Sequence, residues 1–171
     1  MAIHLVQYQP EIHVNTGNIM RTCAATDITL HLIKPLGFSL DEKYIKRASA
    51  SYIEESNYVL YENWEDFEAK NKHGKFYFLT RYGQKNQAQM DFSNKEEDYY
   101  IILGAESSGI PKEILRPYFE NCFRIPMTNK VRSLNVSNVA AILAYEALRQ
   151  QDFLDLWQVE PFKGEDFILE D

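Results

Sequence analysis

The chain has 171 residues, 45% of them hydrophobic, and its 18 basic and 25 acidic residues give a net charge of −7. This length predicts one domain that buries about two thirds of its unfolded surface. No apolar run approaches the roughly 20 residues of a membrane-spanning helix, and Met1 leads into a strand pattern instead of a signal segment. We therefore expect a cytoplasmic protein that does not contact a membrane.

Taken in chain order, the apolar runs predict six short strands, at residues 3–8, 29–33, 58–61, 76–80, 99–103 and 122–125. Helical patterns lie between most of them, at residues 17–26, 41–50, 64–71, 112–119 and 137–150. Strands that alternate with helices, several of them uniformly apolar, predict an α/β fold with a mainly parallel sheet flanked by helices. Residues 82–98 are polar and predict a mobile loop.

The last twenty residues, 152–171, hold seven acidic residues and only Lys163 to offset them, which leaves a net charge of −1 for residues 1–151. We interpret residues 1–151 as the domain and 152–171 as an acidic tail, part of which packs down through Trp157, Phe162 and Phe167. A nearly neutral body is unusual for a nucleic-acid-binding protein. Several basic side chains nevertheless lie near the motifs described next: Arg21, Lys34, Lys43, Lys46, Arg47, Lys130 and Arg132.

Cysteine and histidine spacing argues against a metal site or a disulfide framework. Cys23 and Cys122 are far apart in the sequence, so we expect two buried free thiols. No pair among the four histidines has the spacing of metal ligands. We therefore expect no metal.

Three junctions between a strand and a helix concentrate polar residues. Residues 15–21 read Asn-Thr-Gly-Asn-Ile-Met-Arg, with Gly17 and Asn18 typical of a tight turn. Residues 103–111 read Leu-Gly-Ala-Glu-Ser-Ser-Gly-Ile-Pro and follow a buried strand pattern. Residues 125–138 read Ile-Pro-Met-Thr-Asn-Lys-Val-Arg-Ser-Leu-Asn-Val-Ser-Asn and precede an apolar helix. The polar side chains of the third segment cap that helix or also hold a ligand at its positive end.

Together these segments resemble the three motifs of the SPOUT class of RNA methyltransferases, and most closely the TrmL (YibK-like) type. The resemblance runs from about residue 2 to 151, and residues 30–38, Leu-His-Leu-Ile-Lys-Pro-Leu-Gly-Phe, also carry it. It implies an α/β knot whose last loop and helix thread through an earlier loop. It also implies methyl transfer from S-adenosylmethionine to the ribose 2'-hydroxyl of the wobble nucleotide of tRNA, a cytidine or a modified uridine, with S-adenosylhomocysteine as product.

The resemblance implies a catalytic set of Arg21, Asn15, Glu106 and Asn135. Arg21 matches the arginine of the first motif, and because a guanidinium stays protonated we expect it to stabilise charge rather than accept a proton. The plainer readings are a surface ion pair for Arg21, a helix cap for Asn15, and for Glu106 a favourable interaction with a helix dipole.

The remaining implied sites are for cofactor, RNA and a second subunit. The cofactor would contact Leu79, Gly104, Ile125 and Ser133, and the tRNA would contact Lys43, Lys46, Arg47, Arg132 and Tyr145. A homodimer would bury the helix at 139–148, which is apolar on most of its circumference. The same helix could instead be buried within the knot of one chain, and Tyr145 could simply pack.

The chain departs from the family pattern at His13, Ala105, Ser108 and residues 49–51, and these departures bear on substrate choice. Two alternatives stay open. One is a ribose methyltransferase acting on ribosomal RNA or on another tRNA position, although many such relatives carry an extra RNA-binding domain. The other is an RNA-binding module that kept the scaffold without catalysis.

Overall fold

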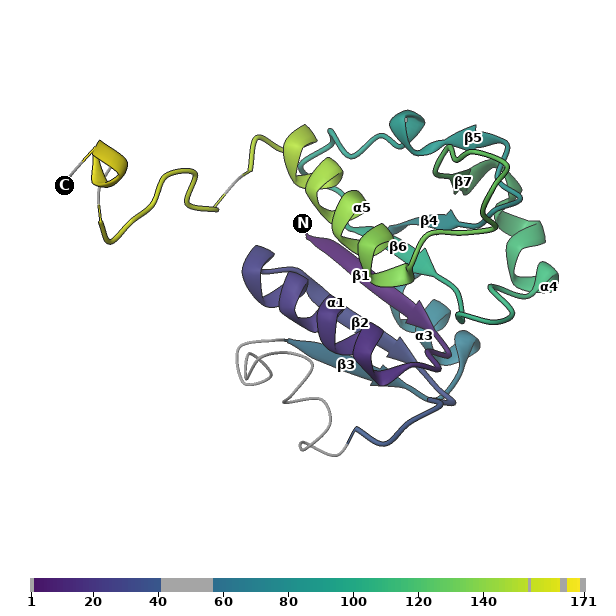
Figure 1. The fold of residues 1–171 in the computed structure, drawn as a ribbon. Helices are drawn as coiled ribbons and strands as arrows, with labels where there is room; N and C mark the ends of the chain where they lie inside the picture. Colours follow the sequence, from purple (N-terminus) through teal and green to yellow (C-terminus); the bar gives the residue numbers. More distant parts are fainter. Residues whose placement is uncertain (1, 41–56, 154, 164–165, 170–171) are drawn as a thin grey trace.

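In the computed structural model, residues 2–40, 57–153, 155–163 and 166–169 are described. Their strands form one seven-stranded sheet in the order β3-β2-β1-β6-β4-β7-β5, and every pairing between neighbours is parallel (Figure 1). The strands are β1 (Ile3–Tyr8), β2 (Thr29–Ile33), β3 (Tyr58–Tyr61), β4 (Lys75–Leu79), β5 (Lys85–Asn86), β6 (Tyr99–Leu103) and β7 (Cys122–Arg124). The predicted parallel α/β sheet is confirmed; the knot stays a prediction.

Helices cover both faces of the sheet, which explains why its central strands are apolar throughout. On one face α1 (His13–Thr26) and α5 (Val136–Gln150) lie side by side. On the other lie α3 (Trp64–Asn71), the short α4 (Lys112–Leu115) and the 3-10 turn η2 (Arg116–Asn121). Strand β6 is buried at all five positions, Tyr99, Tyr100, Ile101, Ile102 and Leu103, because it contributes to both layers.

Helix α1 starts earlier than predicted. The helix begins at His13, so Gly17 and Asn18 lie inside it instead of forming the predicted turn. Asn15, Thr16 and Gly17 are buried within its first turns. Tertiary burial thus overrides the local turn preference of Gly and Asn. As a result, Asn15 is held on a rigid element rather than on a loop.

The prediction of a mobile loop at residues 82–98 is wrong. The segment contains β5 and the 3-10 turn η1 (Gln87–Gln89), and the side chains of Met90 and Phe92 are 1% and 0% exposed. The backbone of Phe92 is held at both polar atoms: its N–H donates to Gln150 Oε1 at 2.8 Å, and its carbonyl accepts from Gln151 Nε2 at 3.0 Å. Two isolated apolar residues, each worth roughly 1.5–3 kcal/mol when buried, anchor an otherwise polar segment.

The aromatic side chains expected to anchor the tail are exposed. Phe153 and Leu156 pack against the core beside α5, but Trp157, Phe162 and Phe167 are 73%, 88% and 47% exposed. Figure 1 shows the chain after α5 leaving the body of the molecule. The tail ends in the 3-10 turn η3 (Phe167–Leu169).

No helix among the described residues is long and apolar enough to cross a membrane. The two cysteines are buried and unpaired, as predicted. Burial raises the pKa of the Cys23 thiol to about 12. Cys23 therefore behaves as a small hydrophobic side chain.

Candidate active site

Four loops meet at one edge of the sheet, where β1, β4, β6 and β7 end. Because the strands are parallel, their carboxyl ends lie on the same edge, the usual place for a ligand in an α/β sheet. A cavity of about 760 Å³ opens there. Its lining includes residues from all three motifs and from the loop after β4: Asn15, Leu79, Arg81, Tyr82, Gly104, Glu106, Arg124, Ile125, Arg132, Ser133 and Asn135.

A chain of hydrogen bonds joins the three motifs inside this cavity. Asn15 Nδ2 donates to Glu106 Oε1 at 3.0 Å, and Asn135 Nδ2 donates to Asn15 Oδ1 at 2.9 Å. Asn135 Oδ1 in turn accepts from the backbone N–H of Ser137 at 2.9 Å, which caps α5. A carboxylate only accepts and a backbone N–H only donates, so both ends of the chain fix which way the two amides point.

The loops after β1 and β6 clamp each other. The backbone N–H of Glu11 donates to Glu106 Oε2 at 2.8 Å, so both carboxylate oxygens of Glu106 are engaged. The carboxylate of Glu11 accepts from the Ser107 hydroxyl at 2.6 Å and from the Ser107 N–H at 2.8 Å. These bonds lower the pKa of Glu11. Glu11 therefore stays ionised at neutral pH and fixes the loop that carries Glu106.

The predicted cofactor residues come together. Leu79, Gly104, Ile125 and Ser133 all line the cavity, although they come from four different segments of the chain. Leu79 and Ile125 also pack against the core, so they form a firm apolar wall. At Gly104 a Cβ would lie 2.5 Å from the carbonyl carbon of Gly109, so no other residue fits this close loop. Apolar walls with a few polar groups are typical of sites for small molecules and cofactors.

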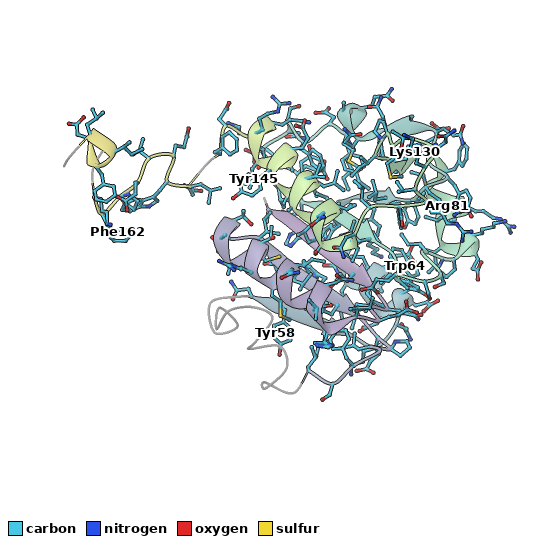
Figure 2. All side chains as sticks on the ribbon, viewed as in Figure 1. Tyr58, Trp64, Arg81, Lys130, Tyr145 and Phe162 are labelled. Atoms are coloured by element: carbon cyan, nitrogen blue, oxygen red, sulfur yellow. The ribbon has the colours of Figure 1, made fainter. Side chains whose placement is uncertain are left out.

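Two predicted residues lie outside this cavity. Arg21 is exposed on α1 beyond Asn15 and does not line the cavity. Tyr145, 49% exposed, lines a second hollow of about 840 Å³ between α5 and residues 87–91. In Figure 2 Tyr145 lies on α5, apart from Arg81 and Lys130. Arg132 is exposed and lines the main cavity.

Some of the predicted RNA-binding residues and one predicted helix lie outside the described residues. Lys43, Lys46, Arg47, the predicted helix at 41–50 and the departures at 49–51 lie outside the described residues. Ala105 and Ser108 line the cavity, so these departures from the family pattern lie in the candidate site itself. Among the described residues no group of three His, Cys, Asp or Glu side chains is arranged to hold a metal ion.

The sequence analysis did not single out three charged or aromatic residues of the cavity: Arg81, Tyr82 and Arg124. They follow or end β4 and β7, and the carboxyl ends of those predicted strands were the available signal. Arg81, Arg124 and Arg132 bring three guanidinium groups to the cavity, and Glu106 is the only acidic residue among the described residues that line it. The body of the protein is nearly neutral, but this site is cationic, as a site for an anionic polymer requires.

Comparison with known proteins shows which family this chain belongs to. Residues 2–145 match the SpoU rRNA Methylase family. The chain belongs to that family. A Bacillus subtilis relative, provisionally named a tRNA (cytidine(34)-2'-O)-methyltransferase, is 53% identical over 156 residues, which cover 91% of this chain and 98% of the relative. A Methylovorus glucosotrophus protein named tRNA (cytidine(34)-2'-O)-methyltransferase is 45% identical and covers 87% of this chain and 96% of its own length.

Solved structures of SpoU-type proteins share the fold. One, from a study of the 2-OH methylation of C/U34 on tRNA, superposes with a TM-score of 0.82 at 36% identity and covers 88% of this chain and 97% of its own. The methyltransferase AviRb from Streptomyces viridochromogenes, solved with S-adenosylmethionine, gives a TM-score of 0.74 at 22% identity, and the match covers 88% of this chain and 58% of its own. The predicted SPOUT methyltransferase fold is confirmed.

Proposed function

We propose that this SpoU-family protein transfers a methyl group from S-adenosylmethionine to the ribose 2'-hydroxyl of the wobble nucleotide in the tRNA anticodon loop. The observation that carries this proposal is the hydrogen-bonded chain Glu106–Asn15–Asn135 in the wall of a cationic cavity that also holds the cofactor residues. The names of the relatives at 53% and 45% identity support the choice of position 34.

The cavity fits the cofactor in size and chemistry. Its volume of about 760 Å³ lies in the range of small-molecule sites. Leu79 and Ile125 provide apolar walls, the backbone at Gly104 provides polar groups without a side chain, and the Ser133 hydroxyl provides a further donor. When bound, S-adenosylmethionine supplies an electrophilic methyl group on its sulfonium, and S-adenosylhomocysteine is left. The chain's own contribution is to orient the ribose against that group, which is worth roughly 7–11 kcal/mol through effective concentration.

Each catalytic residue has a role that suits its chemistry. Asn15, Glu106 and Asn135 form a rigid polar wall that positions the ribose, since each is already fixed by its neighbours. Arg21 remains a cation and stabilises the negative charge that develops on the 2'-oxygen. The proton then passes to water or to a neighbouring phosphate of the RNA.

The placement of Arg21 supports a homodimer in which the second copy completes the site. On α1 the residues Val14, Asn18, Arg21 and Ala25 form an exposed stripe. On the adjacent α5, Ile142 and Tyr145 are 44% and 49% exposed. The proposed two-fold dimer would bury Val14 and Ile142, leave Tyr145 at its rim, and bring the Arg21 of one copy to the cavity of the other. The apolar circumference of the last helix, noted in the sequence, fits the same arrangement.

The tRNA surface in this proposal extends from the cavity mouth, through Arg132, to Tyr145 at the dimer face. Lys43, Lys46 and Arg47 belong to the proposed RNA surface on sequence grounds alone. A tRNA substrate implies a cytoplasmic enzyme. No metal enters the proposed reaction, because a positioned cofactor and fixed protein charges suffice for methyl transfer.

Incubation with labelled S-adenosylmethionine and either bulk tRNA or ribosomal RNA, both from a strain that lacks the gene, tests the proposal. We expect label in tRNA and none above background in ribosomal RNA. Label in ribosomal RNA alone would favour the alternative substrate. Cofactor-independent RNA binding with no label in either pool would favour a non-catalytic module.

A further inference from the structure

Tyr82 is an exposed aromatic residue at the mouth of the cavity. Its side chain lines the cavity, yet the residue is 61% exposed. Among the described residues, aromatic rings mostly pack against one another within the two cores, and Tyr82 has no aromatic neighbour there. Its one ring contact is with Arg81, whose guanidinium carbon lies 4.8 Å from the ring centre. An exposed ring of this kind contributes little to the stability of the protein itself.

The turn that carries Tyr82 is held firmly. It joins β4 to β5, and both of these strands pair with β7. The Thr80 N–H donates to the Phe123 carbonyl at 2.9 Å, and the Gly83 N–H donates to the Thr80 carbonyl at 3.2 Å. Gly83 touches the β7 backbone so closely that a Cβ would lie 2.4 Å from the carbonyl carbon of Phe123. Tyr82 is therefore displayed by a fixed support, and not by a loop free to fold its ring inward.

The surroundings of the ring are cationic. Arg81, Arg124 and Arg132 line the same cavity, and Figure 2 shows Arg81 and Lys130 on the same side of the molecule. A rigid aromatic face among guanidinium groups is the combination that binds single-stranded nucleic acid, since the cations meet phosphates while the ring stacks on a base. Bases in an RNA loop are available for such stacking because they are not held in a duplex.

We propose that Tyr82, supported by Arg81, is a stacking platform for an unpaired base of the RNA strand that holds the target ribose. This inference rests on the proposed function. It adds a substrate contact that neither the motifs nor the cofactor residues include. Stacking on Tyr82 fixes the strand at the cavity mouth, so that the ribose presented to Asn15 and Asn135 enters in one orientation. Because every base has a π-face, the contact tolerates different bases.

The proposal predicts a specific pattern among variants. Tyr82→Ala removes the ring, Tyr82→Phe keeps the ring and removes the hydroxyl, and Tyr58→Ala removes a tyrosine that is 42% exposed on β3 at the opposite end of the sheet. We expect Tyr82→Ala to weaken the binding of an anticodon stem-loop RNA on the order of 10-fold and to raise KM for tRNA similarly, with little change in kcat. Tyr82→Phe and Tyr58→Ala should stay within about two-fold of wild type.

Stem-loop binding is measured by fluorescence anisotropy without cofactor, and S-adenosylmethionine binding by calorimetry. Equal stem-loop affinity for wild type and Tyr82→Ala would overturn the proposal. So would equal weakening by Tyr82→Ala and Tyr82→Phe, which would assign the contact to the hydroxyl. A parallel loss of cofactor affinity in Tyr82→Ala would place the ring in the cofactor site and also overturn it. Failure of the proposed function would instead appear in wild type, as stem-loop binding without methyl transfer to tRNA.

Discussion

Asn135 and Asn15, 120 residues apart in the sequence, are joined by a hydrogen bond of 2.9 Å between Nδ2 of the first and Oδ1 of the second. The same Asn135 side chain caps α5 through its other atom, Oδ1. One residue thus fixes the start of the last helix and the polar wall of the cavity. Any displacement of α5 would be transmitted to Asn15 and then to Glu106.

Asn135→Asp separates these two roles. Aspartate keeps the cap, since it still offers an oxygen to the Ser137 N–H. It cannot donate to Asn15, and it sets a second carboxylate beside that amide. We expect thermal stability close to wild type and a fall in kcat/KM of about 10-fold or more. Loss of activity in proportion to a loss of folded protein would argue that Asn135 acts only as a cap.

Arg21→Ala should lower kcat by about 10²–10³-fold while leaving cofactor affinity intact, because the side chain is assigned to developing charge. The proposed dimer adds a sharper expectation. Asn135→Ala should also be strongly impaired, because it removes both the donor to Asn15 and the cap of α5. A mixture of Arg21→Ala and Asn135→Ala should, after subunit exchange, be more active than either variant alone, since the mixed dimer holds one site with both residues intact. If the mixture stays as inactive as its components, Arg21 acts within its own chain.

Much of the site could be predicted because its residues stand in local motifs. Asn15, Glu106 and Asn135 each follow a recognisable strand, and parallel strands bring such segments to one edge. Tyr82 also follows a predicted strand, but the sequence did not show that its turn is held rigidly, because that depends on β4 and β5 both pairing with β7. The same limit explains the segment at 82–98, where burial of only Met90 and Phe92 decides the structure. Hydrophobic periodicity is weak evidence for secondary structure in a polar segment that holds only two apolar residues.

Two histidines on the α3 face, His31 buried and His4 half-buried, predict acid sensitivity. His31 Nε2 and His4 Nδ1 lie 3.0 Å apart, and His31 Nδ1 lies 2.9 Å from the Tyr61 hydroxyl. Burial is the main cause that lowers the pKa of His4 to about 4 and that of His31 to about 3, against 6.5 in an exposed histidine. A charge on His4 lowers the pKa of His31 further, whereas Asp98 favours protonation of His4 and His73 opposes it.

Both pKa values are depressed in the folded state, so the unfolded chain binds more protons below pH 6.5. The free energy of unfolding should be highest above that pH and fall as the pH drops towards 4. At pH 5 the loss should be about 2 kcal/mol per imidazole. Urea denaturation between pH 8 and 5 measures this slope. The double variant His4→Gln, His31→Gln should lose most of the slope, whatever its stability at pH 8. An unchanged slope would show that the two histidines do not cause the loss of stability at low pH.

Removal of residues 158–171 tests the role of the tail. This segment carries five acidic residues and Lys163, and its Val159, Phe162, Ile168 and Leu169 side chains are 60–90% exposed. The truncation spares Phe153 and Leu156, which pack on the core. We expect an unchanged melting temperature and tighter RNA binding at low salt, with the difference lost at high salt as repulsion is screened. An unfolded truncation would show that the tail belongs to the domain.

In the proposed reaction, the ribose 2'-hydroxyl of the wobble nucleotide accepts the methyl group at the cavity beside Asn15, Glu106 and Asn135. Two synthetic anticodon stem-loops that differ only at position 34, with ribose in one and 2'-deoxyribose in the other, test it directly with labelled S-adenosylmethionine. Both should bind, and only the ribose form should become labelled. Equal labelling of the two RNAs would contradict transfer to the 2'-oxygen, because the methyl group would then have gone to another atom.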